Sequence, residues 1–127
     1  MIATMNNLQH IGVPSKQYEA SIEFYRILGF TEKYATRQLN GKPVAFYELG
    51  NLLMEIYESD EVAGCHGAID HVTIDCADVD EAYAYAKDKG LTIVSEGIEE
   101  LPYWDNGIRF FKVEGPNKEV FEICQIL

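Results

Sequence analysis

Leu8-Gln9-His10-Ile11-Gly12-Val13 and Ile69-Asp70-His71-Val72 are the two stretches of sequence that decide the fold. Each stretch has one histidine near the start of a run with strand-like character, and the two histidines are 61 residues apart. Two glutamates inside apolar runs, Glu55 and Glu122, are 67 residues apart. This spacing predicts two copies of one unit, each with a histidine near its start and a glutamate near its end.

The first unit is predicted to contain one strand, one helix and then three strands. Alternating apolar residues predict a strand over 8–13, which Pro14 ends. Ser15 is predicted to cap a helix that runs to about Leu28 and stops at Gly29. Asn40-Gly41 is typical of a hairpin turn. The three strands that follow the helix are predicted over 30–38, 44–49 and 52–57.

The second unit repeats this order after a polar, glycine-containing linker. A strand over 69–76 precedes a helix that begins near Asp78 with capping-box spacing and stops at Gly90. Three more strands are predicted over 92–95, 108–113 and 119–126. This half has six more residues between its glycine and its glutamate than the first half, and they are assigned to a loop over 101–107.

The predicted fold class is α+β, with tandem βαβββ repeats in a single domain over 1–127. The first repeat covers about 7–58, the linker 59–68 and the second repeat about 69–127. Side chains alternate between the two faces of a strand. The branched and aromatic residues are expected to pack on the helices, which leaves the two histidines and the two glutamates on the opposite, concave face.

These four residues, His10, Glu55, His71 and Glu122, are predicted to bind one divalent metal ion. Burial of a carboxylate within Leu-Leu-Met-Glu-Ile-Tyr or Val-Phe-Glu-Ile-Cys is costly without a partner. Two imidazoles and two carboxylates suit Ni²⁺, Co²⁺, Fe²⁺, Mn²⁺ or Zn²⁺. The alternative is a sheet face that is open to water, or a glutamate paired with a basic strand residue.

Four further residues are candidates for contact with a substrate. Trp104 and Asn106 lie in the longer loop and are predicted to close over a ligand, unless the loop is only a surface loop with an aromatic anchor. Arg37 and Arg109 lie on predicted strands and are candidates for contact with an anionic substrate. The alternative for each is an arginine that is only solvated or salt-bridged.

Composition excludes several classes of protein. The formal net charge of −11, with only ten Lys and Arg, argues against a nucleic-acid partner, because a phosphate backbone requires a basic patch. No apolar stretch approaches the roughly 20 residues that a membrane-spanning helix needs. The start of the chain, residues 1–7, lacks the basic region and apolar run of a signal peptide, so a cytoplasmic protein is expected.

Several motifs give the chain a close resemblance to the vicinal oxygen chelate superfamily and, within it, to glyoxalase I-like proteins. The resemblance covers about Leu8 to Leu127. It rests on residues 8–13, on Ser21-Ile22-Glu23-Phe24-Tyr25 with Leu28-Gly29-Phe30, on Met54-Glu55-Ile56, on Ile69-Asp70-His71-Val72, and on Arg109-Phe110-Phe111-Lys112-Val113-Glu114-Gly115-Pro116 before Val120-Phe121-Glu122-Ile123.

The resemblance implies an open, barrel-like sheet around a metal, commonly in a homodimer. The ligand order His, Glu, His, Glu matches glyoxalase I, a lyase that detoxifies methylglyoxal. The implied reaction isomerises a thiol–2-oxoaldehyde hemithioacetal to a 2-hydroxyacyl thioester through an enediolate that the metal stabilises. Glu122 would be the base that moves the proton and Glu55 would assist it, with one nickel, cobalt or zinc ion per site.

Two departures from the glutathione-using members leave other functions open. Those members carry Arg and Asn where this chain has Pro14 and Ser59, so a thiol other than glutathione is an alternative. Further alternatives are an epimerase or isomerase, a thiol transferase that acts on an antibiotic, and a non-catalytic resistance protein that binds a small molecule.

Overall fold

The computed structural model describes residues 5 and 7–127 and divides the chain into two compact units, 1–62 and 63–127. We call them unit 1 and unit 2. Most of the N-terminal stretch in which no signal peptide is expected lies outside the described residues. The boundary between the units falls inside the predicted linker, 59–68. Among the described residues, neither length nor hydropathy would allow any helix to span a bilayer.

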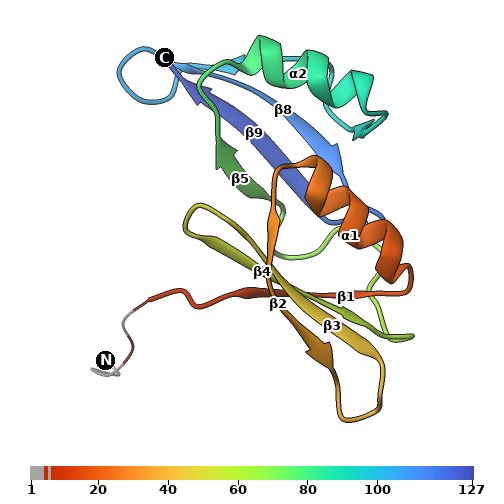
Figure 1. The fold of residues 1–127 in the computed structure, drawn as a ribbon. Helices are drawn as coiled ribbons and strands as arrows, with labels where there is room; N and C mark the ends of the chain where they lie inside the picture. Colours follow the sequence, from red (N-terminus) through yellow and green to blue (C-terminus); the bar gives the residue numbers. More distant parts are fainter. Residues whose placement is uncertain (1–4, 6) are drawn as a thin grey trace. The chain divides into compact units, whose positions relative to one another are not determined.

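Unit 1 contains one helix and a four-stranded mixed sheet (Figure 1). Its elements are β1 (Ile11–Ser15), α1 (Tyr18–Ile27), β2 (Thr31–Arg37), β3 (Pro43–Leu49) and β4 (Leu52–Glu58). The strand order is β1-β4-β3-β2, and β1 pairs with β4 in parallel. The first and last strands of the unit are therefore neighbours.

Unit 2 has the same topology with one more strand. Its elements are β5 (Val72–Asp75), α2 (Val79–Asp88), β6 (Thr92–Ile93), β7 (Glu99–Leu101), β8 (Ile108–Glu114) and β9 (Val120–Ile126). The strand order is β5-β9-β8-β6, β5 pairs with β9 in parallel, and β7 also pairs with β8. The predicted α+β class and the tandem βαβββ order are confirmed.

The helix boundary predicted at Ser15 is wrong. This residue is the last of β1, and the helix begins three residues later without a side-chain cap. The Ser15 hydroxyl instead accepts a hydrogen bond from the backbone N–H of Gln17 (3.0 Å) and shares another with the Ser21 hydroxyl (2.7 Å). Ser15 and Ser21 are fully buried, so their hydroxyls satisfy each other between the strand and the helix.

The edge of the second sheet also differs from the prediction. Glu99 and Glu100, which lie in none of the predicted strands, belong to β7 and pair with β8. The short strands β6 and β7 lie along the same edge of β8 and are interrupted at 94–98. The assignment of all six extra residues to the loop over 101–107 is wrong in part. Some of them lie in the β8–β9 turn, which spans 115–119, because the equivalent β3–β4 turn of unit 1 spans only 50–51.

Each helix covers one face of its own sheet. In unit 1 the Arg26 side chain of α1 donates a hydrogen bond to the hydroxyl of Tyr47 on β3, and Ile56 on β4 is fully buried. In unit 2 the ring of Tyr83 on α2 meets that of Phe111 on β8 edge to face, at 5.2 Å between centroids.

The predicted packing of branched and aromatic strand residues on the helices is wrong in part. Ile108 and Phe110 form a buried cluster with Cys124 on the face of the second sheet that carries Glu122. That face therefore holds apolar residues as well as polar ones.

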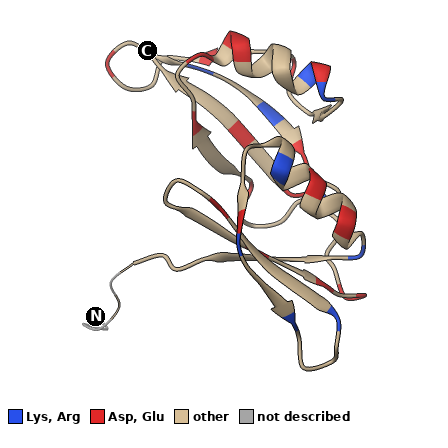
Figure 2. Cartoon of the chain, viewed as in Figure 1, with Lys and Arg blue, Asp and Glu red and all other residues tan. Residues whose placement is uncertain are grey.

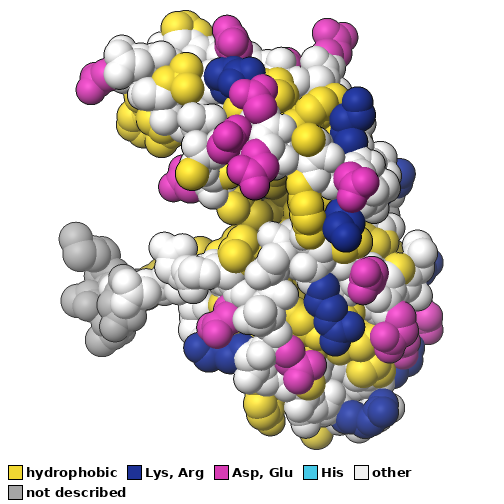
Figure 3. All heavy atoms as spheres, turned by 45° about the horizontal axis from the view of Figure 1, so that its top comes forward, with side chains coloured by type: hydrophobic (Ala, Val, Ile, Leu, Met, Phe, Trp, Pro, Cys, Tyr) yellow, Lys and Arg dark blue, Asp and Glu magenta, His cyan; other side chains and the backbone are white. Residues whose placement is uncertain are grey.

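Acidic residues occur on both helices and on several strands, whereas Lys and Arg residues are fewer and scattered (Figure 2). On the face shown in Figure 3, the basic side chains of the described chain lie in separate spots among acidic and apolar ones. The basic side chains on this face therefore form no continuous patch.

Candidate metal centre

In unit 1 the parallel pairing of β1 with β4 brings His10 and Glu55 together. Glu55 is the register partner of Gly12, and His10 precedes Gly12 by two residues and therefore lies on the same face. The His10 Nε2 atom is 3.8 Å from Glu55 Oε1. The two side chains are 36% and 27% exposed, so this pair is open to solvent or to a ligand.

Unit 2 repeats this geometry at the same register. Glu122 is the register partner of Thr73, which follows His71 by two residues as Gly12 follows His10. The His71 Nε2 atom is 3.5 Å from Glu122 Oε2. Phe121 and Ile123, on either side of the glutamate, pair with Val113 and Phe111 on the opposite face of the sheet. The predicted repeat thus extends to the register of the strands.

The residue before each histidine engages the other ring nitrogen, Nδ1. Asp70 Oδ2 is 2.7 Å from His71 Nδ1, and Gln9 Oε1 contacts His10 Nδ1. An ionised carboxylate can only accept a hydrogen bond, so Nδ1 of His71 carries a proton, and in the neutral ring the lone pair is then on Nε2. Protein histidines that bind metals adopt this arrangement, with the second nitrogen held by a carboxylate or carbonyl oxygen.

The donor atoms fit a divalent metal ion. The Nε2–carboxylate distances of 3.5 and 3.8 Å exceed the ~2.7–3.2 Å of a direct N–H···O hydrogen bond. Two ligands that are each ~2.1 Å from one ion lie roughly 3–3.4 Å apart. Small movements would therefore let each pair bind an ion. Among the described residues, no three His, Cys, Asp or Glu side chains gather as metal ligands, so each unit offers two.

The two pairs differ in the side chains around them. In unit 1 a Cβ added to Gly12 would lie 3.2 Å from Glu55 Oε1, so glycine leaves room for the carboxylate. Phe46 is the register partner of Glu55 on β3, and its ring meets that of His10 at 5.5 Å between centroids. Tyr34 on β2 packs beside Phe46, at 6.2 Å between centroids. Unit 1 therefore surrounds its pair with aromatic rings.

Unit 2 surrounds its pair with polar and charged groups instead. Thr73 donates a hydrogen bond to Glu122 Oε1 (3.3 Å). Lys112 is the register partner of Glu122 on β8, and its Nζ is 3.6 Å from Asp70 Oδ2. The hydrogen bond from His71, and then the charge of Lys112, lower the pKa of Asp70 below its usual value. Asp70 is therefore ionised at neutral pH.

The predicted substrate residues lie in three different places. Arg37, at the end of β2, donates a hydrogen bond to the Gly41 carbonyl oxygen in the β2–β3 turn. Arg109 binds both carboxylate oxygens of Asp80 on α2 (2.7 and 3.1 Å) and lies 3.4 Å from Glu100. It lies on the face of β8 that α2 covers, opposite to Lys112. As substrate ligands, both arginines stay predictions.

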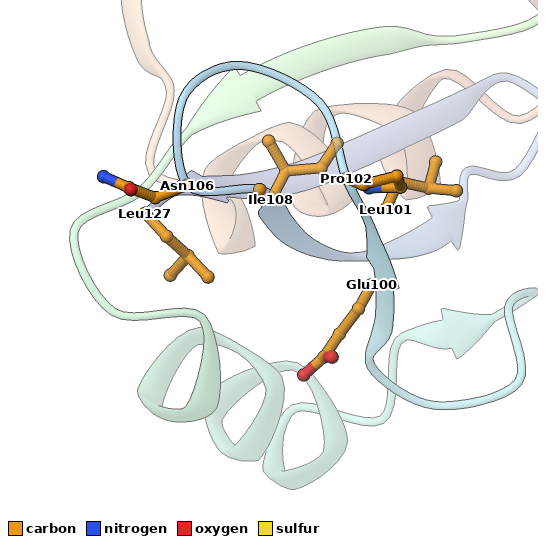
Figure 4. Close-up of a pocket in the computed structure, with 7 residues that line it drawn as sticks. Glu100, Leu101, Pro102, Asn106, Ile108 and Leu127 are labelled. Atoms are coloured by element: carbon orange, nitrogen blue, oxygen red, sulfur yellow. The ribbon is translucent and has the colours of Figure 1, made fainter.

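The loop that was predicted to close over a ligand borders a pocket of about 340 Å³ in unit 2 (Figure 4). Asn106 lines this pocket together with Leu101, Pro102, Ile108 and Leu127. Trp104, at the tip of the loop, is 74% exposed and has a positive φ of 63°. An exposed tryptophan in a conformation that costs roughly 1–3 kcal/mol is consistent with a binding role, which stays a prediction.

Sequence reasoning named the four candidate ligands but missed the side chains that contact them. Gln9 and Asp70 immediately precede the two histidines, and alignment of the two repeats would have placed both at one position. Thr73 and Lys112 are recognisable only from strand register. In unit 1 the position equivalent to Thr73 is Gly12, and the position equivalent to Lys112 is Phe46. Alignment of the two units by strand register therefore shows where they differ.

A family model described as the Glyoxalase/Bleomycin resistance protein/Dioxygenase superfamily matches residues 7–123. The chain is 30% identical over 126 residues to the uncharacterized protein YwbC of Bacillus subtilis. The alignment covers 93% of this chain and 96% of that protein.

Among solved structures, the fosfomycin resistance protein FosX of Listeria monocytogenes superposes with a TM-score of 0.76 at 19% identity, over 94% of this chain and 93% of that one. A structure of the same protein complexed with Mn(II) and a sulfate ion has a TM-score of 0.75 at 18% identity, over 98% of this chain and 95% of that one. A glyoxalase family protein from Enterococcus faecalis has a TM-score of 0.75 at 16% identity, over 98% and 99% of the two chains.

The ion pair of Arg109 with Asp80 predicts a specific pH dependence of stability. The hydrogen bond from Arg109 lowers the pKa of Asp80 in the folded protein. The pair therefore stabilises the fold above the unfolded pKa of about 3.9, and its contribution is lost as the pH falls through the lower folded pKa. Asp80→Asn should lower the urea midpoint at pH 7, and its difference from wild type should vanish in stronger acid.

Asp88→Asn, near the other end of α2, is the control for the loss of one negative charge. If Asp80→Asn and Asp88→Asn give the same midpoints at every pH, the ion pair contributes nothing to stability and Arg109 is free for another role.

Proposed function

The chain belongs to the glyoxalase/bleomycin resistance protein/dioxygenase superfamily, and we propose that it is a metal-dependent lyase of the glyoxalase I type. The observation that supports this proposal is the duplicated pair of His and Glu at identical strand register, His10 with Glu55 and His71 with Glu122. In each pair a lone-pair nitrogen faces a carboxylate oxygen, and the other ring nitrogen is already engaged.

We propose that one divalent ion takes its ligands from both pairs, in the order His, Glu, His, Glu that the resemblance implies, because protein sites for such ions use three or four protein ligands. Nickel, cobalt and zinc all suit this donor set. Once bound, the ion would supply Lewis-acid stabilisation of charge on two adjacent substrate oxygens.

Glu122 is the proposed base. The Thr73 hydroxyl holds its Oε1, and its side chain is only 12% exposed, so the carboxylate is oriented and partly shielded from water. In the proposed reaction it removes the proton from the carbon that carries sulfur and hydroxyl, while the electron pair shifts toward the neighbouring carbonyl. Returning that proton to the former carbonyl carbon, while the hydroxyl proton passes to the former carbonyl oxygen, yields the 2-hydroxyacyl thioester with no net oxidation. Glu55 would assist from unit 1.

The thiol of the substrate is proposed to differ from glutathione. Pro14 and Ser59 occupy the positions at which the resemblance to glutathione-using members would require Arg and Asn. Both are structural in this fold: Pro14 lies within β1, and the Ser59 backbone N–H donates a hydrogen bond to the Ser15 carbonyl oxygen (3.0 Å). Neither side chain supplies a charge or an amide for a glutathione carboxylate.

Reconstitution with Ni²⁺ and assay of methylglyoxal with a panel of cellular thiols tests the function. We expect thioester formation that depends on metal and is faster with another thiol than with glutathione. A metal-loaded protein that is inactive with every thiol would contradict the proposal. Fosfomycin, assayed in parallel because of the FosX neighbours, would reveal a different activity of the superfamily.

Glu122→Gln tests the assignment of the base. Loss of a general base typically costs 10²–10⁴-fold in rate, so we expect a decrease in kcat of about that size. Glu99→Gln, which removes an exposed carboxylate from β7, is the control and should retain activity. The metal content of each variant must be measured, so that a lost base is distinguished from a lost ion. Wild-type turnover by metal-loaded Glu122→Gln would remove Glu122 from this role.

A homodimer is the proposed assembly. Leu8 and Ile69 precede the two histidines by two residues each, and they are 72% and 82% exposed. Large exposed apolar side chains beside polar residues are typical of surfaces that a partner covers. Light scattering should give twice the chain mass of 14.4 kDa, and the mass of a single chain at micromolar concentration would contradict the proposal.

A further inference from the structure

We propose that the two His–Glu pairs bind the metal unequally and that Asp70 is a positioning residue that makes His71 the stronger imidazole ligand. This inference rests on the proposed metal site and names residues to which no role has been assigned. It depends on four differences between the units: the partner of the histidine, the partner of the glutamate, the residue opposite the glutamate, and the exposure of the pair.

The partner of the histidine is charged in unit 2 and neutral in unit 1. Asp70 accepts the Nδ1–H of His71 at 2.7 Å with a carboxylate, whereas the Gln9 oxygen that contacts His10 belongs to an amide. Hydrogen bonds to an ionised acceptor are roughly twice as strong as those between neutral groups. A carboxylate partner also raises the electron density at Nε2, which makes the ring a better metal ligand.

The glutamate of unit 2 is also held more firmly. Thr73 Oγ1 donates to Glu122 Oε1, but the residue at the same register position in unit 1 is Gly12, which has no side chain to donate. The Glu122 side chain is 12% exposed and that of Glu55 is 27% exposed. Less conformational freedom is therefore lost when Glu122 becomes a ligand.

Lys112 completes the set in unit 2. It is opposite Glu122 across β8 and β9, and its Nζ lies 3.6 Å from Asp70, so one cation offsets two neighbouring carboxylates. The counterpart in unit 1 is Phe46, whose ring packs on His10 without adding charge. Unit 2 thus has a cation beside the aspartate that orients its histidine, and unit 1 has an aromatic ring at the equivalent position.

The repeat provides a matched pair of substitutions. Asp70→Asn gives His71 the kind of neutral partner that His10 has, and Gln9→Glu gives His10 the kind of charged partner that His71 has. The full-length apo-protein is titrated with Co²⁺ in competition with a chromophoric chelator, which reports affinity independently of catalysis. The visible spectrum of the bound Co²⁺ gives a second readout, which follows the geometry of the ligands.

We expect Asp70→Asn to weaken Co²⁺ binding by about 10–100-fold, the usual cost of losing such a partner, and to change the Co²⁺ spectrum. Gln9→Glu should strengthen binding, and Gln9→Ala should weaken it less than Asp70→Asn does. Asp75→Asn removes the same charge from β5 at a position without contact to His71 and should bind as wild type does. Urea midpoints show whether each variant is folded.

Two outcomes would overturn the inference. In the first, the Asp70→Asn variant binds Co²⁺ as tightly as the Asp75→Asn variant does. In the second, the Gln9→Ala variant loses as much affinity as the Asp70→Asn variant does. These results are distinguishable from failure of the proposed function. If wild-type protein binds no Co²⁺, the metal site itself is absent, whereas tight binding by wild type and Asp70→Asn alike removes only the role of Asp70.

Discussion

The parallel pairing of the first strand of each unit with its last strand is the constraint on which the site depends. Residues at the start and end of a unit are adjacent in space only because these two strands are neighbours. Register then decides which side chains meet. In unit 1 Gly12 pairs with Glu55, and in unit 2 Thr73 pairs with Glu122. A shift by one residue would turn each glutamate toward the helix, because side chains alternate with a period of two.

The proposed site needs ligands from both units. A single βαβββ unit offers one imidazole and one carboxylate, which is fewer than the three protein ligands of catalytic zinc sites. Two units together would supply four ligands of two types. The residues around these ligands differ, because Thr73 and Lys112 are polar neighbours of one pair, whereas Gly12 leaves space and Phe46 places an aromatic ring beside the other. The proposed site, which has to hold an ion and accept an asymmetric substrate, would use this difference.

Much of this fold follows from patterns that are visible in the sequence. The period of two in the strands predicted the faces correctly, because Glu55 and Glu122 interrupt runs in which their neighbours are apolar. The hairpin at Asn40-Gly41 and the helix stops at Gly29 and Gly90 were also predicted from local sequence. Each of these glycines has a positive φ value, a conformation that glycine adopts more readily than other residues. Local signals of this kind act between residues that are close in the chain.

The errors concern contacts between strands, or between a strand and a helix, which local periodicity does not encode. Ser15 resembles a helix cap locally, but it is the last residue of β1 and its hydroxyl is hydrogen-bonded to that of Ser21 on α1. Glu99 and Glu100 were placed in no predicted strand, but an edge of β8 pairs with them. Thr73 meets Glu122 because β5 pairs with β9, and Lys112 lies opposite Glu122 because β8 pairs with β9. Such contacts have no signature in a local pattern.

The central claim is that one metal ion takes an imidazole from each unit. X-ray absorption spectroscopy of Ni²⁺-loaded protein tests it most directly, because scattering from the imidazole ring counts histidine ligands. The account predicts two imidazoles per ion, at about 2.0–2.1 Å if the distances resemble those of zinc sites, and one imidazole in His10→Ala or His71→Ala. A wild-type spectrum with no imidazole, or with one imidazole per ion and two ions per chain, would contradict it.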